Sequence, residues 1–458
     1  ALAAGLLTLL AIELVGWPAG FIAGLLFAVH PVHVEATSSL VGRAELMVAT
    51  GYAIALLCAL RTKESRWWLA GVVLGSALAI GSKEHAATLP AAALLILVWR
   101  GGKWRDAIMP AAAAALPIIA YFMLRGPVAG GALNSGGMAP GLEGLSAVQR
   151  TIAMTGVSIQ WWRLLAFPLH LSSDWSTAQV PVNTLLTVGL VLTAMLWIAA
   201  ASIAFHQRRT VPGLALGVLW FLLTIAPVAN VAVPTESVLA ERTLYLPSLG
   251  AMIAAASLIV LLPRQRLVRA CLAVLLVALA TRSILRNQAW RDVTAARLAL
   301  IHDAPKSYRT LWLLGDEAFA HGRPGTGERL LHDAMAAAPG IPGPVEDLAG
   351  YYSAAGLHPQ ATALLRKAIT LNHSRSKPWM LMENADLAGR DTAAAVRWAL
   401  RSAELFPRDA DVLNQALGTL IVARECVQAG RLLGTRPTVF TPEGGEQARR
   451  AIAACRTP

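Results

Sequence analysis

The sequence predicts an all-α protein, with a polytopic bundle of membrane helices over residues 1–292 and an α-solenoid of paired helices over residues 293–458. The first observation is composition: 56% of the 458 residues are hydrophobic and 14% are charged, whereas a typical soluble domain carries about 25% charged residues. The second observation is the uneven distribution of charge. The first part holds 20 basic and 11 acidic residues, whereas the much shorter second part holds 19 basic and 16 acidic residues. The third is a 34-residue repeat confined to the second part.

Ten apolar stretches in the first part are candidate membrane spans, each of which needs about 20 residues. Several are shorter, and a hairpin turn is expected at Trp17-Pro18, so buried or re-entrant helices remain the alternative for its two arms. Residues 126–144 are expected to form a glycine-rich outer loop, and residues 150–170 an amphipathic helix on the outer surface, because Arg163 interrupts their apolar character. The candidate spans are 2–15, 17–29, 44–60, 67–82, 86–99, 107–124, 185–205, 214–230, 246–262 and 268–285.

The basic residues of the short turns predict the orientation, because Lys and Arg stay preferentially on the cytoplasmic side. With ten spans, both the start of the chain and the repeats then lie on the non-cytoplasmic side (periplasmic or extracellular) of a multi-pass protein in the cell inner (plasma) membrane. The net charge of +12 therefore reflects orientation in a lipid bilayer, and no nucleic acid is expected as a partner. The turns assigned to the cytoplasm carry Arg61, Lys63, Arg66, Arg100, Lys103, Arg105, Arg208, Arg209, Arg264, Arg266 and Arg269.

The second part repeats with a fixed period, since Pro339, His373 and Pro407 each close a similar phrase and lie 34 residues apart. This is the period of the tetratricopeptide repeat, a pair of antiparallel helices. Three to four repeats are expected over residues 293–458. Stacked repeats of this kind usually bind a partner along a concave face, and the alternative is a rigid spacer or a dimerisation arm.

Four polar clusters in the first part are the candidate site, because polar groups next to membrane segments are costly and commonly functional. In chain order, the first is residues 30–35 with 41–45, the second 82–85, the third 171–175 and the fourth 240–247. The predicted topology places all four on the outer side. The cations suit a phosphate, and the carboxylates could orient those cations or take a proton. The alternative is helix capping with interfacial ion pairs. The candidate substrate-binding residues are His30, His33, Arg43, Lys83, His85, Glu241, Arg242 and Tyr245, and the supporting carboxylates are Glu35, Glu45, Glu84 and Asp174.

Metal and disulfide chemistry are less clearly indicated. His30, His33 and Glu35 could ligate a divalent metal, but no second His pair at helical spacing supports this, so neither a metal site nor any other cofactor is assigned. Cys426 and Cys455 lie in the part expected outside the cytoplasm, where a disulfide can persist. Unpaired small core residues remain an equal alternative for these two cysteines.

Six phrases of the sequence together resemble the transmembrane and tetratricopeptide-repeat O-mannosyltransferases, and the resemblance extends over essentially the whole chain. Any single phrase would be weak. The high Ala, Gly and Arg content favours a bacterial member. The phrases are Phe27-Ala-Val-His-Pro-Val-His-Val-Glu-Ala36, Gly42-Arg-Ala-Glu-Leu46, Lys83-Glu84, Leu171-Ser-Ser-Asp174, Pro227-Val-Ala-Asn230 and Glu241-Arg-Thr-Leu-Tyr-Leu-Pro-Ser248.

The resemblance implies a GT-C glycosyltransferase fold and an inverting transfer of a sugar, expected to be mannose, from a polyprenyl phosphate to Ser or Thr hydroxyls of an exported protein. In such proteins the principal catalytic acid lies in the first outer loop, after the first helix. This chain begins at what resembles the second helix, so we expect that acid in a preceding segment and only supporting roles for the carboxylates named above.

Two other functions remain open. The first is a non-catalytic membrane scaffold whose repeats recruit a partner protein while the polar clusters brace the helices. The second is a flippase or transporter for a lipid-linked sugar. Charges in mid-span would favour transport, but here they lie at helix ends, apart from Glu13.

Overall fold

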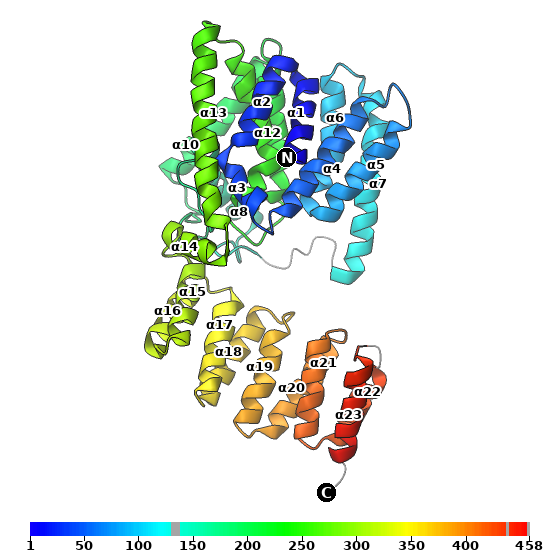
Figure 1. Cartoon of the computed structure of the whole chain (residues 1–458), viewed down its shortest axis with the longest axis vertical. Coiled ribbons are helices and arrows are strands. Elements are labelled where there is room, and N and C mark those ends of the chain that lie inside the picture. The colour runs from blue at the N-terminus through cyan, green and yellow to red at the C-terminus, as the bar shows by residue number, and fades with distance from the viewer. Residues whose placement is uncertain (130–137, 437–438, 456–458) are drawn as a thin grey trace. The chain divides into compact units, whose positions relative to one another are not determined.

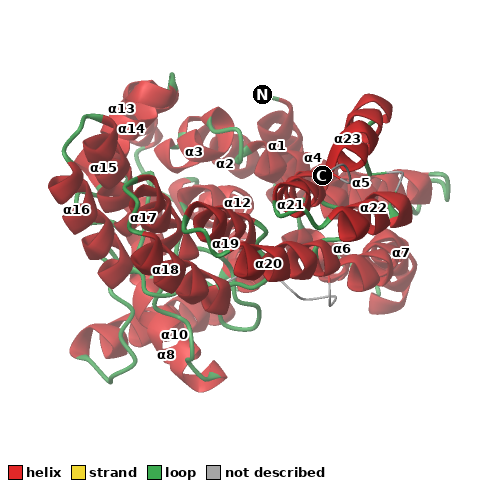
Figure 2. Ribbon diagram, turned by 90° about the horizontal axis from the view of Figure 1, so that it is seen from below, coloured by secondary structure: helices red, strands yellow, loops and turns green. Residues whose placement is uncertain are grey.

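The computed structural model describes residues 1–129, 138–436 and 439–455, and all regular secondary structure in these ranges is helical (Figures 1 and 2). The predicted all-α class is therefore confirmed. Within the described ranges, β-type pairing is limited to an isolated antiparallel bridge between Trp175 and Leu239. Part of the loop expected at residues 126–144 lies outside them. The chain divides into two compact units, Ala1–Pro305 and Lys306–Pro458.

Each of the ten apolar stretches forms a helix in the first unit. Their bounds are α1 (Leu2–Val15), α2 (Trp17–Val29), α4 (Arg43–Leu60), α5 (Trp68–Ser82), α6 (Leu89–Trp99), α7 (Trp104–Ala129), α10 (Val188–His206), α11 (Pro212–Ile225), α12 (Tyr245–Ile259) and α13 (Gln265–Asn287). Among the described residues, five helical stretches are long and apolar enough to cross a membrane, and α2 with the bent segment after it would make a sixth. The first unit is therefore of the membrane type.

The remaining apolar helices are shorter than a full span. Helix α1 has 14 residues, which gives a length of about 21 Å, against a bilayer hydrocarbon core of about 30 Å. Helices α5, α6 and α11 have 15, 11 and 14 residues. These helices pack among the longer ones, so sequence hydrophobicity alone does not separate them from spanning helices.

Two helix pairs cross through facing glycines. Helices α4 and α5 meet at Gly51 and Gly75, and helices α11 and α12 meet at Gly217 and Gly250. A Cβ added to Gly217 would lie 2.3 Å from the carbonyl oxygen of Gly250, and a Cβ on Gly51 would lie 2.5 Å from the carbonyl oxygen of Gly75. Small residues of this kind let the backbones of membrane helices approach closely, so both crossings require glycine.

Short helices connect the long ones and carry most of the predicted polar clusters. They are η1 (Pro31–His33), α3 (Val34–Ser38), η2 (Glu84–Thr88), α8 (Ala147–Val157), α9 (Ile159–Ala166), η3 (Ala226–Val228), η4 (Glu241–Leu244), η5 (Gln288–Trp290) and α14 (Val293–Asp303). The segment expected as one amphipathic surface helix is thus two helices, α8 and α9, separated at Ser158. Trp161 and Leu164 on α9 are buried, because this helix packs into the unit.

The second unit consists of successive helix pairs, as the period predicts (Figure 1). The core positions of the pairs are filled as expected, with Leu331, Leu348, Leu365 and Met382 all at most 1% exposed. The helices are α15 (Tyr308–Ala320), α16 (Pro324–Ala337), α17 (Pro342–Ala354), α18 (His358–Leu371), α19 (Lys377–Ala388), α20 (Thr392–Leu405), α21 (Ala410–Val422), α22 (Cys426–Thr435) and a final helix α23 (Pro442–Cys455).

The turn within each pair uses a left-handed backbone conformation at the same place. Gly322 and Gly356 have φ values of 68° and 77°, and Arg390 and Arg424 have values of 65° and 59°. These four residues are spaced by the 34-residue period. In the third turn Gly389 has a φ of −75°, and the left-handed residue is the arginine that follows it. An L-residue with a side chain is strained in this conformation.

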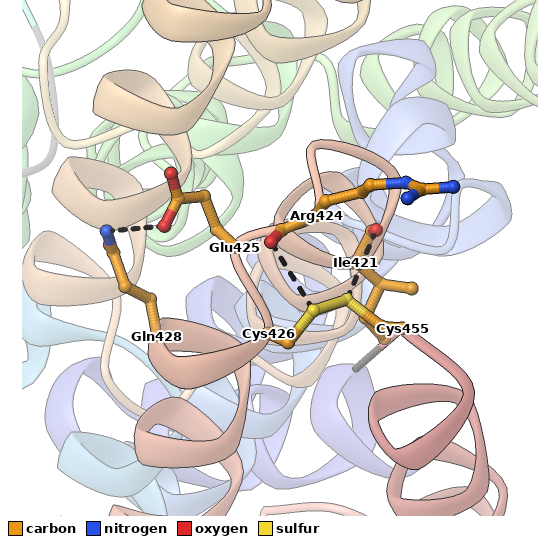
Figure 3. The surroundings of a disulfide bond; sticks show 6 residues. All are labelled: Ile421, Arg424, Glu425, Cys426, Gln428 and Cys455. Atoms are coloured by element: carbon orange, nitrogen blue, oxygen red, sulfur yellow. Dashed lines mark hydrogen bonds between the residues drawn. A yellow bond between two sulfur atoms is a disulfide. The ribbon is translucent and has the colours of Figure 1, made fainter. Parts of the chain in front are cut away.

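A disulfide joins Cys426 at the start of α22 to Cys455 at the end of α23 (Figure 3). The two Cα atoms are 5.9 Å apart and the cysteines are separated by 29 positions in the sequence. Of the two alternatives for these cysteines, the structure therefore has the disulfide. The other two cysteines, Cys58 and Cys271, are free. The bond ties the final helix to the last helix pair.

Candidate functional site

The four predicted polar clusters come into direct contact with one another in the first unit. Cluster pairs far apart in the sequence are joined by side-chain bonds, such as the one between Glu35 and Arg242, which are 207 positions apart. The bonds involve mainly the short segments η1, α3, η2 and η4, which follow or precede long apolar helices. The residues therefore form a continuous polar region rather than isolated helix caps.

Glu35 on α3 and Arg242 on η4 form a buried ion pair. The carboxylate of Glu35 accepts a hydrogen bond from the backbone N–H of Arg242 at 3.0 Å and another from its guanidinium. The side chain of Glu35 is 4% exposed and that of Arg242 is 26% exposed. Charge-assisted bonds of this kind are stronger than neutral ones, and they fix α3 against η4. The Nε atom of Arg242 is buried and has no hydrogen-bond partner among the described residues.

His30 and His33 have both ring nitrogens engaged. The Nδ1 atom of His30 accepts from the backbone N–H of Val32, so Nε2 carries the proton and donates to the Leu165 carbonyl at 3.1 Å. The Nδ1 atom of His33 lies 2.7 Å from the Phe27 carbonyl, and its Nε2 atom lies 2.8 Å from the hydroxyl of Ser248. These bonds hold the bend after α2. In the ranges that the structure describes, no group of three His, Cys, Asp or Glu residues is placed to hold a metal ion.

Glu45 near the start of α4 binds the cluster on η2. Its carboxylate lies 2.5 Å from Nζ of Lys83 and 3.3 Å from Nε2 of His85. Glu45 is 1% exposed at its side chain, whereas Lys83 is 31% exposed. The adjacent Glu84 accepts a hydrogen bond from the hydroxyl of Tyr121 at 2.8 Å. A buried carboxylate thus positions the ammonium group of a lysine whose side chain is partly exposed.

Arg43 differs from the other cations of the site. Arg43 is exposed, and its side chain makes no hydrogen bond or ion pair with any residue in the described ranges. It lies two positions before Glu45, at the first residue of α4. The Arg43 guanidinium can therefore contact an external anion without first giving up an internal partner.

Glu241 holds the loop that contains the third cluster. One of its carboxylate oxygens accepts from the backbone N–H of Ser172 at 2.6 Å and from Nε1 of Trp175 at 3.1 Å. Glu241 is 1% exposed, and Asp174, which lies in the loop with Ser172 and Trp175, is 8% exposed. Tyr245 packs its ring against those of Phe27 and His33, with centroid distances of 5.0 and 4.8 Å. Glu241 and Tyr245 are thus interior residues that shape the region.

Several residues that complete this region were not among the candidate site residues. Ser172, Trp175 and Ser248 supply partners to predicted residues, and Asn230 bonds to the loop before η4 through Ser237 at 2.9 Å and Thr235 at 2.6 Å. Asn230 has a φ of 58°, which asparagine tolerates better than most residues. The phrases around Ser172, Asn230 and Ser248 did carry a signal, because they belong to the family-like motifs.

Comparison with known proteins points the same way as the motifs. The sequence matches no protein-family model. It is 26% identical to the protein O-mannosyl-transferase TMTC4 of Homo sapiens over 51% of this chain and 37% of that protein. It is 28% identical to the protein O-mannosyl-transferase F38B6.6 of Caenorhabditis elegans over 50% of this chain and 33% of that protein. It is 24% identical to the protein O-mannosyl-transferase Tmtc3 of Drosophila melanogaster over 62% of this chain and 37% of that protein.

Two solved structures are also similar, though weakly. The crystal structure of yeast Tom70 has 13% sequence identity and a TM-score of 0.31, with 88% of each chain covered. PilF of Pseudomonas aeruginosa has 16% identity and a TM-score of 0.29, over 35% of this chain and 80% of that one. Both TM-scores are too low to bear on fold or function. The chain spans about a third of the length of the curated relatives named above, and it is similar to protein O-mannosyl-transferases over that part.

Proposed function

We propose that this protein is a membrane glycosyltransferase that moves a sugar, mannose by similarity, from a polyprenyl phosphate to Ser or Thr hydroxyls of an exported protein. The observation that carries this proposal is the similarity to several proteins named as O-mannosyl-transferases, over half of the chain or more. The clustering of acidic and basic side chains from separate loops supports it. Such a region suits a substrate whose lipid tail lies in the bilayer and whose phosphate and sugar face the polar groups.

In the proposed reaction, the acceptor hydroxyl attacks the anomeric carbon of the sugar. The bond between that carbon and the phosphate oxygen breaks, the hydroxyl proton passes to a base, and the polyprenyl phosphate leaves with the bonding electrons. Arg43, Lys83 and Arg242 would stabilise the phosphate as its charge increases. Glu35 and Glu45 would hold two of these cations in place, because both carboxylates are already bound to them.

The repeats would bind the acceptor or a partner protein on the non-cytoplasmic side. Two observations support this placement. The basic turns of the first unit favour it by the positive-inside rule, and the bond between Cys426 and Cys455 is of a kind that persists mainly in oxidising compartments. A GT-C-type fold, a bacterial origin and the inner membrane are likewise proposed by resemblance and composition.

A non-catalytic scaffold is the second candidate, and one observation favours it. The carboxylates of Glu35, Glu45 and Glu241 are all buried and bonded within the protein, as expected of groups that brace helices. In this case the repeats would recruit a partner and the membrane unit would only anchor them.

Sugar transfer by membranes that contain the full-length protein, with the segment in which the catalytic acid is expected, tests the proposal. The assay measures transfer of labelled mannose from a polyprenyl phosphate to a Ser/Thr-rich peptide. Arg43→Ala is the cleanest variant, because this side chain has no partner among the described residues, and Arg242→Ala removes a second cation of the site. Each should lower turnover at least tenfold, since a charged hydrogen bond contributes about 1.5–3 kcal/mol. Arg66→Ala, at a turn expected on the cytoplasmic side, is the control. Unchanged turnover in both site variants would reject the site, and no transfer by the unaltered protein would favour the scaffold.

A further inference from the structure

Helix α13 buries a single residue among its 23, and that residue is Arg286. Its apolar side chains point outward, as the 66% exposure of Val277 and of Ile284 illustrates. Arg286, one residue before the end of the helix, is 6% exposed. A buried charge near a membrane segment is costly and usually has a specific partner. The partners of Arg286 therefore indicate why an arginine occupies this position.

Only part of the Arg286 guanidinium is engaged. Its Nη1 atom donates to Oδ2 of Asp303 at 2.7 Å. Its Nε and Nη2 atoms are buried and have no hydrogen-bond partner among the residues that the structure describes. A buried donor without a partner costs about 1–3 kcal/mol, and more when the group is charged. The residues that the structure describes therefore do not account for this edge of the guanidinium.

The two unbonded atoms form one edge of the planar group, with their N–H bonds nearly parallel. The same edge of Arg375 in the second unit binds a carboxylate, with Nε donating to Oε1 of Glu346 at 2.9 Å and Nη2 donating to Oε2 at 3.0 Å. This two-pronged geometry matches two oxygens of a carboxylate or a phosphate. The buried Nε and Nη2 edge of Arg286 thus has the donor geometry that binds an oxyanion, and we call it the oxyanion-binding edge.

The surroundings of Arg286 connect it to the polar region. The charges of Arg286 and Glu35 both act on the Glu241 carboxyl, which is itself bonded to the loop at Ser172. Ser283 lies three positions earlier on α13, and its hydroxyl donates to the carbonyl of Val29 at 2.7 Å. Val29 is the residue directly before His30. The oxyanion-binding edge therefore lies at the end of α13 that carries the site, beside an outward-facing apolar helix surface.

We propose that the Nε and Nη2 edge of Arg286 binds two oxygens of the phosphate group of a lipid-linked phosphate. The assignment of the lipid rests on the proposed function, and it follows from the position of the edge at the end of an exposed apolar helix. Asp303 holds the guanidinium in place through Nη1, which leaves the other edge for the ligand. Arg286 is then a substrate-binding residue that none of the motifs contains.

Binding of short probes to the full chain in detergent micelles tests this proposal. The probes are farnesyl phosphate, inorganic phosphate and farnesol, and titration calorimetry gives each Kd. Arg286→Lys keeps the charge but removes the planar edge, so we expect farnesyl phosphate to bind at least about tenfold more weakly. Arg269→Lys makes the same change at the exposed opposite end of α13 and should leave the Kd unchanged. Farnesol should bind equally weakly to all variants.

A second variant separates ligand binding from damage to the fold. Asp303→Asn removes the ion pair but keeps the edge, so it should retain most of the affinity for farnesyl phosphate. Unaltered affinity in Arg286→Lys, or an equal loss in Asp303→Asn, would overturn the proposal. Inorganic phosphate that binds as tightly as farnesyl phosphate and with the same dependence on Arg286 would overturn the lipid assignment.

A measurement on the unaltered protein keeps the test valid if Arg286→Lys does not fold. Farnesyl phosphate should then slow backbone hydrogen exchange over residues 282–303, and no change there would overturn the proposal. Failure of this proposal can be distinguished from failure of the proposed function, because ligand binding and sugar transfer are measured separately. Binding that depends on Arg286 in a protein without mannosyl transfer supports this inference and rejects the enzyme, whereas transfer without such binding does the reverse.

Discussion

Glu383 on α19 should make the repeat unit less stable at alkaline pH than at acidic pH. The carboxyl is fully buried, and it accepts hydrogen bonds from Ser402 on α20 at 2.6 Å and from Thr419 on α21 at 3.2 Å. Burial raises its pKa from 4.5 to about 7, although the two hydroxyls oppose the shift. A difference of about 2.5 pKa units corresponds to roughly 3 kcal/mol as an upper value.

The sign follows from proton linkage. An acid with a raised pKa in the folded state contributes its full stability below the unfolded value, near pH 4.5, and loses it as pH rises through about 7. Glu383→Gln resembles the protonated form, so the variant and the unaltered protein should be similar at pH 4.5. At pH 8 the variant should be the more stable by up to about 3 kcal/mol.

Hydrogen exchange measured peptide by peptide over α19 to α21 in the full chain is the assay, because it reports local stability in a protein with two units. Comparing variant and unaltered protein at the same pH cancels the intrinsic pH dependence of exchange. Glu404→Gln is the matched control, since Glu404 is exposed and pairs with Arg401 on the same helix. A difference between Glu383→Gln and the unaltered protein that is the same at pH 4.5 and pH 8 would refute the reasoning.

Four further changes have outcomes set by single contacts. Glu35→Gln should lower the thermal midpoint in detergent, because breaking a buried pair costs about 3–5 kcal/mol; an unchanged midpoint would contradict the buried pair. Cys455→Ser should cost about 2–4 kcal/mol, seen as faster hydrogen exchange confined to α22 and α23. Gly217→Ala places its Cβ 2.3 Å from a backbone oxygen and should destabilise by at least about 1–3 kcal/mol, whereas Gly5→Ala, with nothing within 4 Å, should not destabilise. Arg390→Gly should raise resistance to proteolysis in urea, because it relieves a left-handed strain of about 1–2 kcal/mol.

The features that repeat along the sequence were predictable, because they depend on local periodicity. The 34-residue spacing gave the repeat unit, and apolar stretches gave the positions of ten helices. Their lengths were less predictable: α6 starts at Leu89, because residues 84–88 form a tighter helix. Hydrophobicity indicates that a segment is buried, but not whether protein or lipid surrounds it.

The contacts within the site were not predictable, because they depend on how distant helices pack. Sequence placed Glu35 and Arg242 on one side of the membrane, but nothing in their spacing indicates that they pair. The same holds for Glu241 and the Ser172 loop. Arg286 was missed for a different reason, since an arginine near the end of an apolar helix is normally an exposed interfacial group.

The glycine crossings restrict how the polar region can open. Glu45 lies in the first turn of the helix that crosses at Gly51, and Glu241 precedes the helix that crosses at Gly250. With backbone atoms in contact at these points, neither helix can rotate or slide against its neighbour without a clash. In the proposed transferase, entry and exit of the lipid-linked substrate would therefore depend on the connecting loops and on helices α10 and α13, which are the least buried of the five spanning stretches. Loop substitutions should then change how fast the proposed substrate is exchanged, whereas substitutions at the crossings should change whether the protein folds.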